Sequence, residues 1–423
     1  MRWPSSRHFC LAVLAWTHAA GRVAAQELSD SQVSQIRSRL AEVALKSWEL
    51  GTRAQVLLEL DAPAFSVFSP NPLPPPHEIP SNLTGLISSV MSIARNVVGG
   101  RAASNKNATG PQPLMQDGSA ADPASIGIAV LLANWTGQGG QDYAGAAKDQ
   151  LDFLMQRVPR TDDGAISHRV SEVQLWNDYM YMVPPFLAYY GVLTRDKSLV
   201  TEAYNQCKLY RNYLRDTHAN NLWQHILLGS FNDTGHWSTG NAWAASGLLR
   251  VLATIQHSEY DNQFKHEKSD LASWTTEIHE AMYSRMDNSN VFPNYASRAV
   301  NDPGNFYDAA STALLASTVY RLSLLWGTHR HLPFAERSRK TLFTNSSNHL
   351  TSEGWLQPVV NPHSFGEQGQ HSPEGQAFVL ALHASYSDWV KDGAKGANAA
   401  VRLSVVGMPW LWACLLVGIV FAF

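Results

Sequence analysis

Hydrophobic residues recur at three- and four-residue spacing along most of the chain, which is the pattern of helices that bury one face. Residues 30–48 show it first, with Val33, Ile36, Leu40 and Val43 on one side. Strand-like alternation of polar and apolar residues is scarce, so we expect an all-α protein. Further segments with a helical pattern are 125–135, 144–158, 197–214, 240–255, 269–286, 308–326, 333–343 and 372–390.

These segments and their neighbours predict about eleven or twelve helices, joined in consecutive pairs by short loops as antiparallel neighbours require. Some segments are apolar nearly all round, such as residues 311–320, and belong in an inner layer. Inner and outer helices in similar number predict an (α/α)6 barrel over residues 26–392. No repeat period is strict enough for a solenoid. Residues 69–80 and 99–122 are expected to be loop-rich excursions from this scaffold.

Both ends of the chain carry apolar segments outside this pattern. Arg2 and Arg7 precede an apolar run and small residues follow up to Ala25, so we expect residues 1–25 to be a signal peptide. Residues 393–404 are small and polar, and 405–423 are apolar throughout. This order predicts a spacer with an anchor-attachment site and then a GPI-signal tail that is removed. A membrane-anchoring helix is the alternative. Either arrangement predicts an extracellular protein held at the cell surface.

Composition agrees with secretion and excludes some functions. Five N-x-S/T sequons are present, and of three cysteines only Cys207 lies between the two terminal segments. One cysteine allows no disulfide and no cysteine-based zinc site. A formal net charge of −3 without basic runs argues against nucleic acid as a partner. We expect a monomer without cofactor or metal, whose membrane contact is confined to the C-terminal anchor.

Asp178 stands out because it is an ionisable carboxyl group inside an aromatic and aliphatic run, Val173–Gly191. It follows Trp176, and Pro184 and Pro185 are expected to kink or restart the helix that follows. One interpretation makes Asp178 an N-cap for free backbone amides. The other places it in a poorly hydrated site, where burial disfavours the charged form and a carboxylic acid can donate a proton.

A second carboxyl group allows the same two interpretations. Asp122 precedes Pro123, an arrangement typical of an N-cap followed by the first residue of a helix, and Asp117 is a competing candidate. Between Asp117 and Asp178 lies the pair His168 and Arg169, which fits either a solvated loop or a site.

The densest cluster of polar and aromatic residues lies between Asn220 and Leu249, and a similar mixture returns in residues 361–378. Tryptophans interleaved with histidine and asparagine fit a sugar platform, since flat rings stack on sugar faces and polar groups bind hydroxyls. The histidines lack metal-ligand spacing, and no nucleophile elbow or phosphate loop is present. The first cluster contains Trp223, His225, His236, Trp237, Asn241 and Trp243, and the second contains His363, Glu367, Gln370, His371 and Glu374.

Five motifs in this order resemble the unsaturated rhamnogalacturonyl hydrolases, glycoside hydrolase family 105. The related unsaturated glucuronyl hydrolases of family 88 share their scaffold within the six-hairpin glycosidase superfamily. The resemblance is clearest from Gly164 to Trp389 and implies an (α/α)6 barrel with the site in its mouth. The motifs are LWNDYMYMVPPFLAYYG (175–191), LWQH (222–225), HWSTGNAWAASGLL (236–249), YDAASTALLAS (307–317) and PEGQAFVL (373–380).

The resemblance also implies roles for single residues. The general acid of the family falls on Asp178, and the carboxylate that positions sugar hydroxyls and water falls on Asp122. One departure is Thr239, because the family often has an arginine there that holds the uronate carboxylate. The implied substrate-binding residues are His168, Arg169, Trp176, Trp223, His225, Trp237, Asn241 and Trp243.

The implied chemistry differs from ordinary glycoside hydrolysis. A Δ4,5-unsaturated uronic acid, as pectin lyases produce, is protonated at C4, and water traps the cation at C5. The hydrated sugar then opens and releases its neighbour, so a single acid suffices without a covalent intermediate. Two alternatives remain: another (α/α)6 cell-wall glycosidase or transglycosidase, and an inactive carbohydrate-binding wall protein on the same scaffold.

Overall fold

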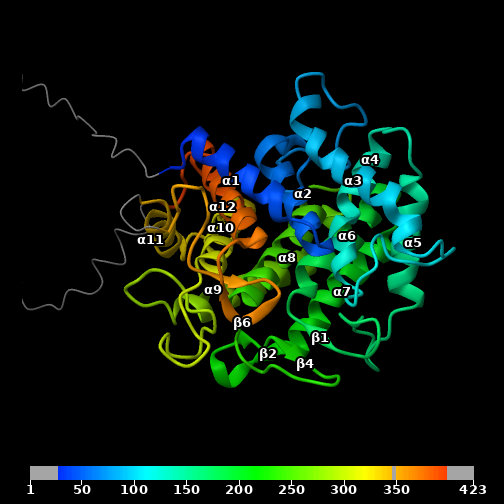
Figure 1. The fold of residues 1–423 in the computed structure, drawn as a ribbon. Helices are drawn as coiled ribbons and strands as arrows, with labels where there is room; N and C mark the ends of the chain where they lie inside the picture. The colour runs from blue at the N-terminus through cyan, green and yellow to red at the C-terminus, as the bar shows by residue number, and fades with distance from the viewer. Residues whose placement is uncertain (1–26, 345–348, 398–423) are drawn as a thin grey trace, which may run out of the picture.

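The computed structural model describes residues 27–344 and 349–397, and within them the fold is an (α/α)6 barrel (Figure 1). Six inner helices follow one another around the barrel axis, and an outer helix lies beside each of them. The all-α prediction is therefore confirmed. The inner helices are α2 (Ser47–Asp61), α4 (Gly127–Trp135), α6 (Tyr179–Thr194), α8 (Ser238–Gln256), α10 (Ala309–Trp326) and α12 (Pro373–Lys391). The outer helices are α1 (Asp30–Val43), α3 (Thr84–Ser104), α5 (Tyr143–Gln156), α7 (Lys197–Leu214), α9 (Lys265–Tyr283) and α11 (Leu332–Phe343).

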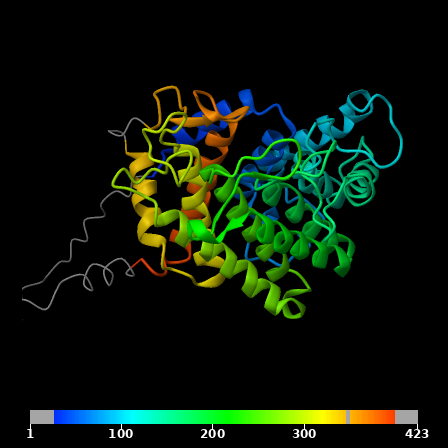
Figure 2. The same ribbon diagram turned by 90° about the horizontal axis from the view of Figure 1, so that it is seen from below.

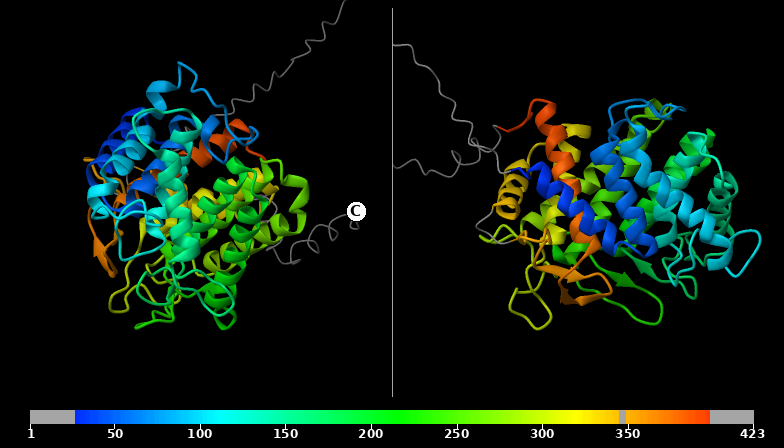
Figure 3. Two further views of the ribbon diagram at one scale, coloured as in Figure 1. Left: turned by 90° about the vertical axis from the view of Figure 1, so that its right-hand side faces the viewer. Right: turned by 45° about the horizontal axis from the view of Figure 1, so that its top comes forward.

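The ring closes because the first inner helix packs against the last. Contacts run from α2 through the 3-10 turn Asp122–Ile126 to α6, and then through α8, α10 and α12 back to α2. Figure 3 shows the blue N-terminal helices beside the orange-red α12. Helices α6, α8 and α10 are buried on nearly every side, because outer helices cover one face and ring neighbours cover the others.

Three two-stranded sheets lie at the end of the barrel where the inner helices begin (Figures 1 and 2). β1 (Leu175–Trp176) pairs with β4 (Ile226–Leu227), and β2 (Arg215–Asp216) pairs with β3 (Leu222–Trp223). The third sheet is the hairpin of β5 (Val359–Asn361) and β6 (Ser364–Gly369). β1 leads into α6 and β6 leads into α12, so these strands fix the entry points of two inner helices.

Two predicted boundaries are corrected. The segment 30–48 belongs to two helices rather than one. The Glu49 side chain points back along the chain, and its Oε2 accepts the backbone N–H groups of Leu45 and Lys46, so that a new helix, α2, begins after Lys46. Residues 99–104, expected in a loop, complete the last turns of α3.

The proline pair does not end α6, although Pro184 and Pro185 lack the N–H groups that would bond Met180 and Tyr181. The helix continues because α8 replaces one donor: Arg250 Nη1 donates to the Tyr181 carbonyl oxygen at 2.8 Å.

The predicted signal peptide, most of the spacer and the apolar tail lie outside the described residues, so their roles stay predictions. Within 27–344 and 349–397, no helix is both long and apolar enough to span a bilayer.

Candidate active site

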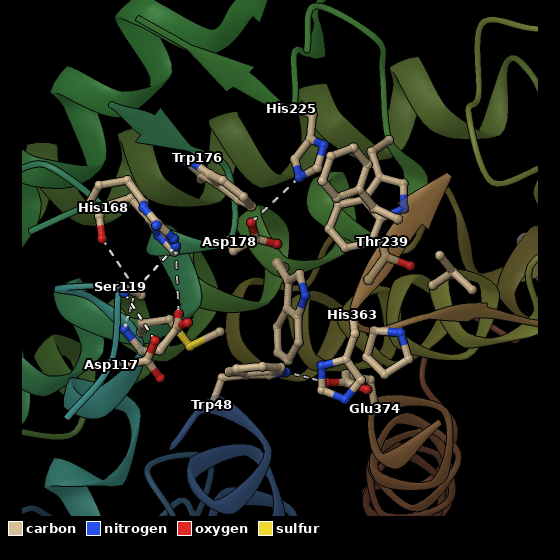
Figure 4. Close-up of a pocket in the computed structure, with 18 residues that line it drawn as sticks. Trp48, Asp117, Ser119, His168, Trp176, Asp178, His225, Thr239, His363 and Glu374 are labelled. Atoms are coloured by element: carbon tan, nitrogen blue, oxygen red, sulfur yellow. Dashed lines mark hydrogen bonds and ion pairs between the residues drawn. The ribbon is translucent and has the colours of Figure 1, made fainter. Parts of the chain in front are cut away.

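A cavity of about 340 Å³ opens at the end of the barrel where the inner helices begin (Figure 4). Its wall takes residues from the starts of five inner segments: Trp48, Asp122, Asp178, Thr239 and Glu374. A helix N-terminus carries partial positive charge, so this end of the ring favours carboxylates and anionic ligands. The volume lies within the range of about 300–1,000 Å³ typical of small-molecule sites.

Asp178 occupies the N-cap position of α6 but makes no side-chain capping hydrogen bond. Its side chain lines the cavity instead, with Oδ2 3.7 Å from Nε2 of His225. The residue is only 9% exposed. The structure therefore contradicts the capping interpretation and leaves the carboxyl group facing a potential substrate.

His225 is held between two carboxyl groups. Its Nδ1 lies 2.9 Å from Asp233 Oδ2, which also accepts the Tyr295 hydroxyl at 2.6 Å. Burial alone would lower the pKa of His225, but the hydrogen bonds and charges of Asp178 and Asp233 outweigh burial and raise it. Burial likewise opposes ionisation of Asp233, yet the bonds from His225 and Tyr295 lower the pKa of Asp233 to about 2. Because Asp233 is an acceptor, Nδ1 carries a proton and Nε2 faces Asp178.

Asp122 is the first residue of the 3-10 turn before α4, whose N-cap is Ala121, so the structure contradicts the N-cap interpretation of Asp122. Its Oδ1 lies 3.9 Å from His168 Nε2, and its backbone N–H donates to Ser119 Oγ at 3.0 Å. Burial, and then the charges of Asp117 and Asp178, raise the pKa of Asp122 well above its usual range. Asp122 therefore retains its proton at a pH where an isolated aspartic acid has lost it.

His168 and Arg169 lie on the same wall as Asp122. His168 stacks on Trp176 with ring centroids 4.9 Å apart, and burial lowers its pKa to about 4. It is therefore a neutral imidazole, unlike His225. Arg169 is half-buried and is the one guanidinium among the described residues that line the cavity.

Aromatic rings form much of the remaining wall. The Phe365 ring, from β6, stands edge-on to Trp176 and His225, and Trp237 lies 4.6 Å from the His225 ring. Trp243, on α8, also lines the cavity. Such a surface suits the apolar faces of a sugar ring.

Two predicted sugar contacts are corrected, because Trp223 and Asn241 are fully buried and do not line the cavity. Asn241 Oδ1 accepts the Trp223 backbone N–H, and its Nδ2 donates to the carbonyls of Trp223 and Trp237, each at 2.9 Å. Both residues order the backbone that carries Trp237 rather than contacting a ligand.

Several lining residues were absent from the predicted set, chiefly Trp48, His363, Phe365 and Glu374. His363 and Glu374 belong to the second polar-aromatic segment, which was a usable signal. Trp48 gave no signal, because a tryptophan in a helical stripe is ordinarily a core residue. In the structure its indole N–H donates to Glu374 Oε1.

Thr239, at the position where the resemblance suggests arginine, lines the cavity and donates its hydroxyl hydrogen to Asp308 Oδ2 at 2.8 Å.

In the part of the chain that the structure describes, no group of three His, Cys, Asp or Glu side chains is arranged to hold a metal ion.

Solved structures of similar fold include glycoside hydrolases of families 105 and 88. A possible member of family 105 from Salmonella enterica has a TM-score of 0.64 and 17% identity, covering 84% of this chain and 92% of its own. A family 105 hydrolase from C. acetobutylicum has a TM-score of 0.64 and 13% identity, covering 84% and 99%. The unsaturated glucuronyl hydrolase of Bacillus sp. GL1 has a TM-score of 0.57 and 14% identity, covering 83% and 94%. These likenesses show the fold.

In sequence, no curated protein matches the chain. The profile of Glycosyl Hydrolase Family 88 matches residues 94–348, which is more than half of the chain and includes Asp122, Asp178 and His225. The resemblance to families 105 and 88 is confirmed: the chain belongs to glycosyl hydrolase family 88 and is a glycoside hydrolase.

Proposed function

We propose that this hydrolase removes Δ4,5-unsaturated uronyl residues from oligosaccharides that lyases release from pectin, with rhamnogalacturonan as the parent polymer. The observation that carries the proposal is that Asp122 and Asp178, from different segments, line one aromatic cavity, each beside a buried histidine. A single cavity with two carboxyl groups and stacking rings provides the acid, the water-binding group and the sugar platform that the reaction needs.

In the proposed reaction, Asp178 donates its proton to C4 of the vinyl ether, and the positive charge develops at C5 and the ring oxygen. Water adds to C5 and returns a proton to Asp178, which restores the acid. The hemiketal at C5 then opens to a ketone, C1 becomes an aldehyde, and the neighbouring sugar leaves as an alcohol. One water is consumed and the glycosidic bond is never attacked directly.

The surrounding residues assist these steps. His225 faces Asp178, and its raised pKa favours a protonated ring that stabilises the carboxylate left when the proton has moved to C4. Asp122, favoured in its protonated form, binds the attacking water or a ring hydroxyl. Arg169 provides permanent positive charge for the uronate carboxylate.

The test is loss of the alkene absorbance when purified protein is incubated with lyase-generated rhamnogalacturonan oligosaccharides. We expect Asp178→Asn to lower kcat by about 10²–10⁴-fold, since it removes the donated proton. Asp162→Asn, an exposed aspartate, serves as the matched control and should leave kcat unchanged. Constant absorbance with folded wild-type protein across the pH range would reject the substrate, and full activity of Asp178→Asn would reject the acid.

A second candidate, hydrolysis of a saturated cell-wall glycoside, is favoured by Thr239, because its hydroxyl is committed to Asp308 and brings no charge for a uronate. Product analysis separates the two: only hydration of the double bond yields an opened keto-uronate.

A further inference from the structure

The charges around the cavity raise a problem for an anionic sugar. Four carboxyl groups line it, and Arg169 is the one permanent cation among the described lining residues. Arg169 lies on the wall of Asp117 and Asp122, where its guanidinium borders Gly118. The part of the wall formed by Trp48 and Glu374, labelled in Figure 4, has a carboxyl group and no fixed positive side chain.

Glu374 is unusual because it is a buried carboxyl group without a cation. It is 5% exposed in the first turn of α12, and within residues 27–344 and 349–397 no Lys, Arg or His forms an ion pair with it. Its bonds come from the Trp48 indole N–H and from Ser372 Oγ at 3.1 Å. A buried, unpaired carboxylate is costly, and stability alone gives no reason to keep one in this wall.

The hydrogen bonds restrict where a proton can sit on this group. Indole nitrogen only donates, so Oε1, which faces Trp48, acts as an acceptor. The proton of the neutral acid is therefore confined to Oε2, beside Ser372 Oγ. That hydroxyl also accepts the Gly375 N–H at 3.0 Å. Because Ser372 Oγ is the donor in its contact with Oε2, the proton of a neutral Glu374 is left for another acceptor, and Glu374 lines the cavity.

We propose that Glu374 is a specificity-determining residue whose protonated carboxyl group donates a hydrogen bond to the carboxylate of a bound uronic acid, so that the anionic sugar and a proton bind together. The inference rests on the proposed substrate class. An O–H···O⁻ bond of this kind is short and strong, whereas ionised Glu374 would repel the same ligand.

The surroundings of Glu374 favour the neutral form. Burial, and then the charge of Glu49, raise the pKa of Glu374 to about 7 despite the bonds from Trp48 and Ser372. Glu49 approaches from α2 and His363 from the turn between β5 and β6, with His363 Nε2 3.6 Å from Glu49 Oε1. The titratable groups on the other walls of the cavity are Asp117, Asp122, His168, Arg169, Asp178 and His225.

The experiment measures binding of an unsaturated galacturonyl-rhamnose disaccharide to the Asp178→Asn protein by calorimetry, from about pH 6 to about pH 8.5. We expect the Kd to rise about tenfold per pH unit above about pH 7. Adding Glu374→Gln, which keeps an acceptor for Trp48 and supplies an N–H donor, should reduce the change to less than about twofold over the same range. The control Glu367→Gln, an exposed glutamate on β6, should keep the full pH dependence.

A second ligand keeps the test independent of any variant's folding. The methyl ester of the disaccharide is neutral and should bind with the same Kd across this range. A pH-dependent Kd for the ester, or a slope that persists with Glu374→Gln, would overturn the role of Glu374. Wild-type turnover of the disaccharide is scored separately: its absence would reject the proposed function, while the binding data would still report on Glu374.

Discussion

His168 and His225 line one cavity, yet their contacts shift their pKa values in opposite directions. His168 meets a hydroxyl and an indole ring, and burial decides its pKa. His225 meets two carboxyl groups, whose charges outweigh burial. The consequence is a division of roles: burial keeps the imidazole beside Asp122 neutral, whereas the carboxyl groups favour protonation of the imidazole beside Asp178.

This division predicts the effect of Asp233→Asn. Removing the carboxylate lowers the pKa of His225, so the pH above which kcat declines should move down by about one unit, measured as a kcat–pH profile. Tyr295→Phe removes only a hydrogen bond to Asp233 and is the matched control, with a smaller displacement. An unchanged profile for Asp233→Asn would contradict the charge assigned to His225.

Asp233→Asn should also change the free energy of unfolding in a pH-dependent way. The depressed pKa of Asp233 stabilises the fold above about pH 4, and this contribution is lost as pH falls towards 2. The raised pKa of His225 contributes fully below about pH 6.5 and is lost as pH rises through the folded-state value. The wild type should therefore exceed Asp233→Asn in unfolding free energy most clearly between about pH 4 and pH 6.5, by about 1–2 kcal/mol.

At the scale of elements, the contact between α6 and α8 decides how Asp178 is presented. Arg250 on α8 bonds the Tyr181 carbonyl freed by Pro185, and its guanidinium lies 4.3 Å from the Tyr181 ring centroid. Gly247 allows the approach, because a Cβ there would lie 1.9 Å from the Met180 carbonyl oxygen. Sequence patterns predicted that the prolines kink or restart the helix, because the replacement donor comes from a helix distant in the sequence.

Gly247→Ala should therefore force α6 and α8 apart and lower the free energy of unfolding by about 3 kcal/mol or more. Gly100→Ala, in α3 with no atom within 4 Å of the added Cβ, is the matched control and should leave stability equal or slightly higher. Urea unfolding of both variants measures the difference. If Gly247→Ala and Gly100→Ala unfolded at the same urea concentration, α6 and α8 would have room to separate without loss of stability.

At the scale of the whole molecule, the sequence predicted what depends on local pattern and on motif order. Helix periodicity and the series of motifs were sufficient for the barrel and for the wall of Asp122 and Asp178. Another part of the wall combines Trp48 with Glu374, which lie near the two ends of the described chain and meet only because α2 packs on α12. Trp223 and Asn241 show the reverse error, because a motif residue that orders backbone looks the same in sequence as one that touches substrate.

Ring closure itself depends on a buried charge network at the end of the barrel opposite the cavity. Arg321 on α10 is 2% exposed and lies 2.9 Å from Glu59 on α2 and 2.7 Å from Asp388 on α12. One side chain thus joins the first, fifth and last inner helices of the ring. Removing it leaves the buried Glu59 carboxylate without a positively charged partner, with only the Gln55 amide still donating to it, which is more costly than removing both groups.

We expect Arg321→Met to lower the unfolding free energy by about 3–5 kcal/mol, and the double variant with Glu59→Gln to recover much of that loss, because no uncompensated buried charge remains. Arg330→Met, which breaks an exposed pair with Glu280, is the control and should change stability by less than about 1 kcal/mol. Denaturant unfolding, followed by tryptophan fluorescence and by circular dichroism, measures the unfolding free energy of each of these variants. If closure of the ring holds the two ends of the chain together, the two signals will change in one transition in every variant, and the cavity wall of Trp48 and Glu374 will be lost together with the barrel. Separate transitions in Arg321→Met would instead show that the chain folds as two halves and that α12 docks on α2 afterwards.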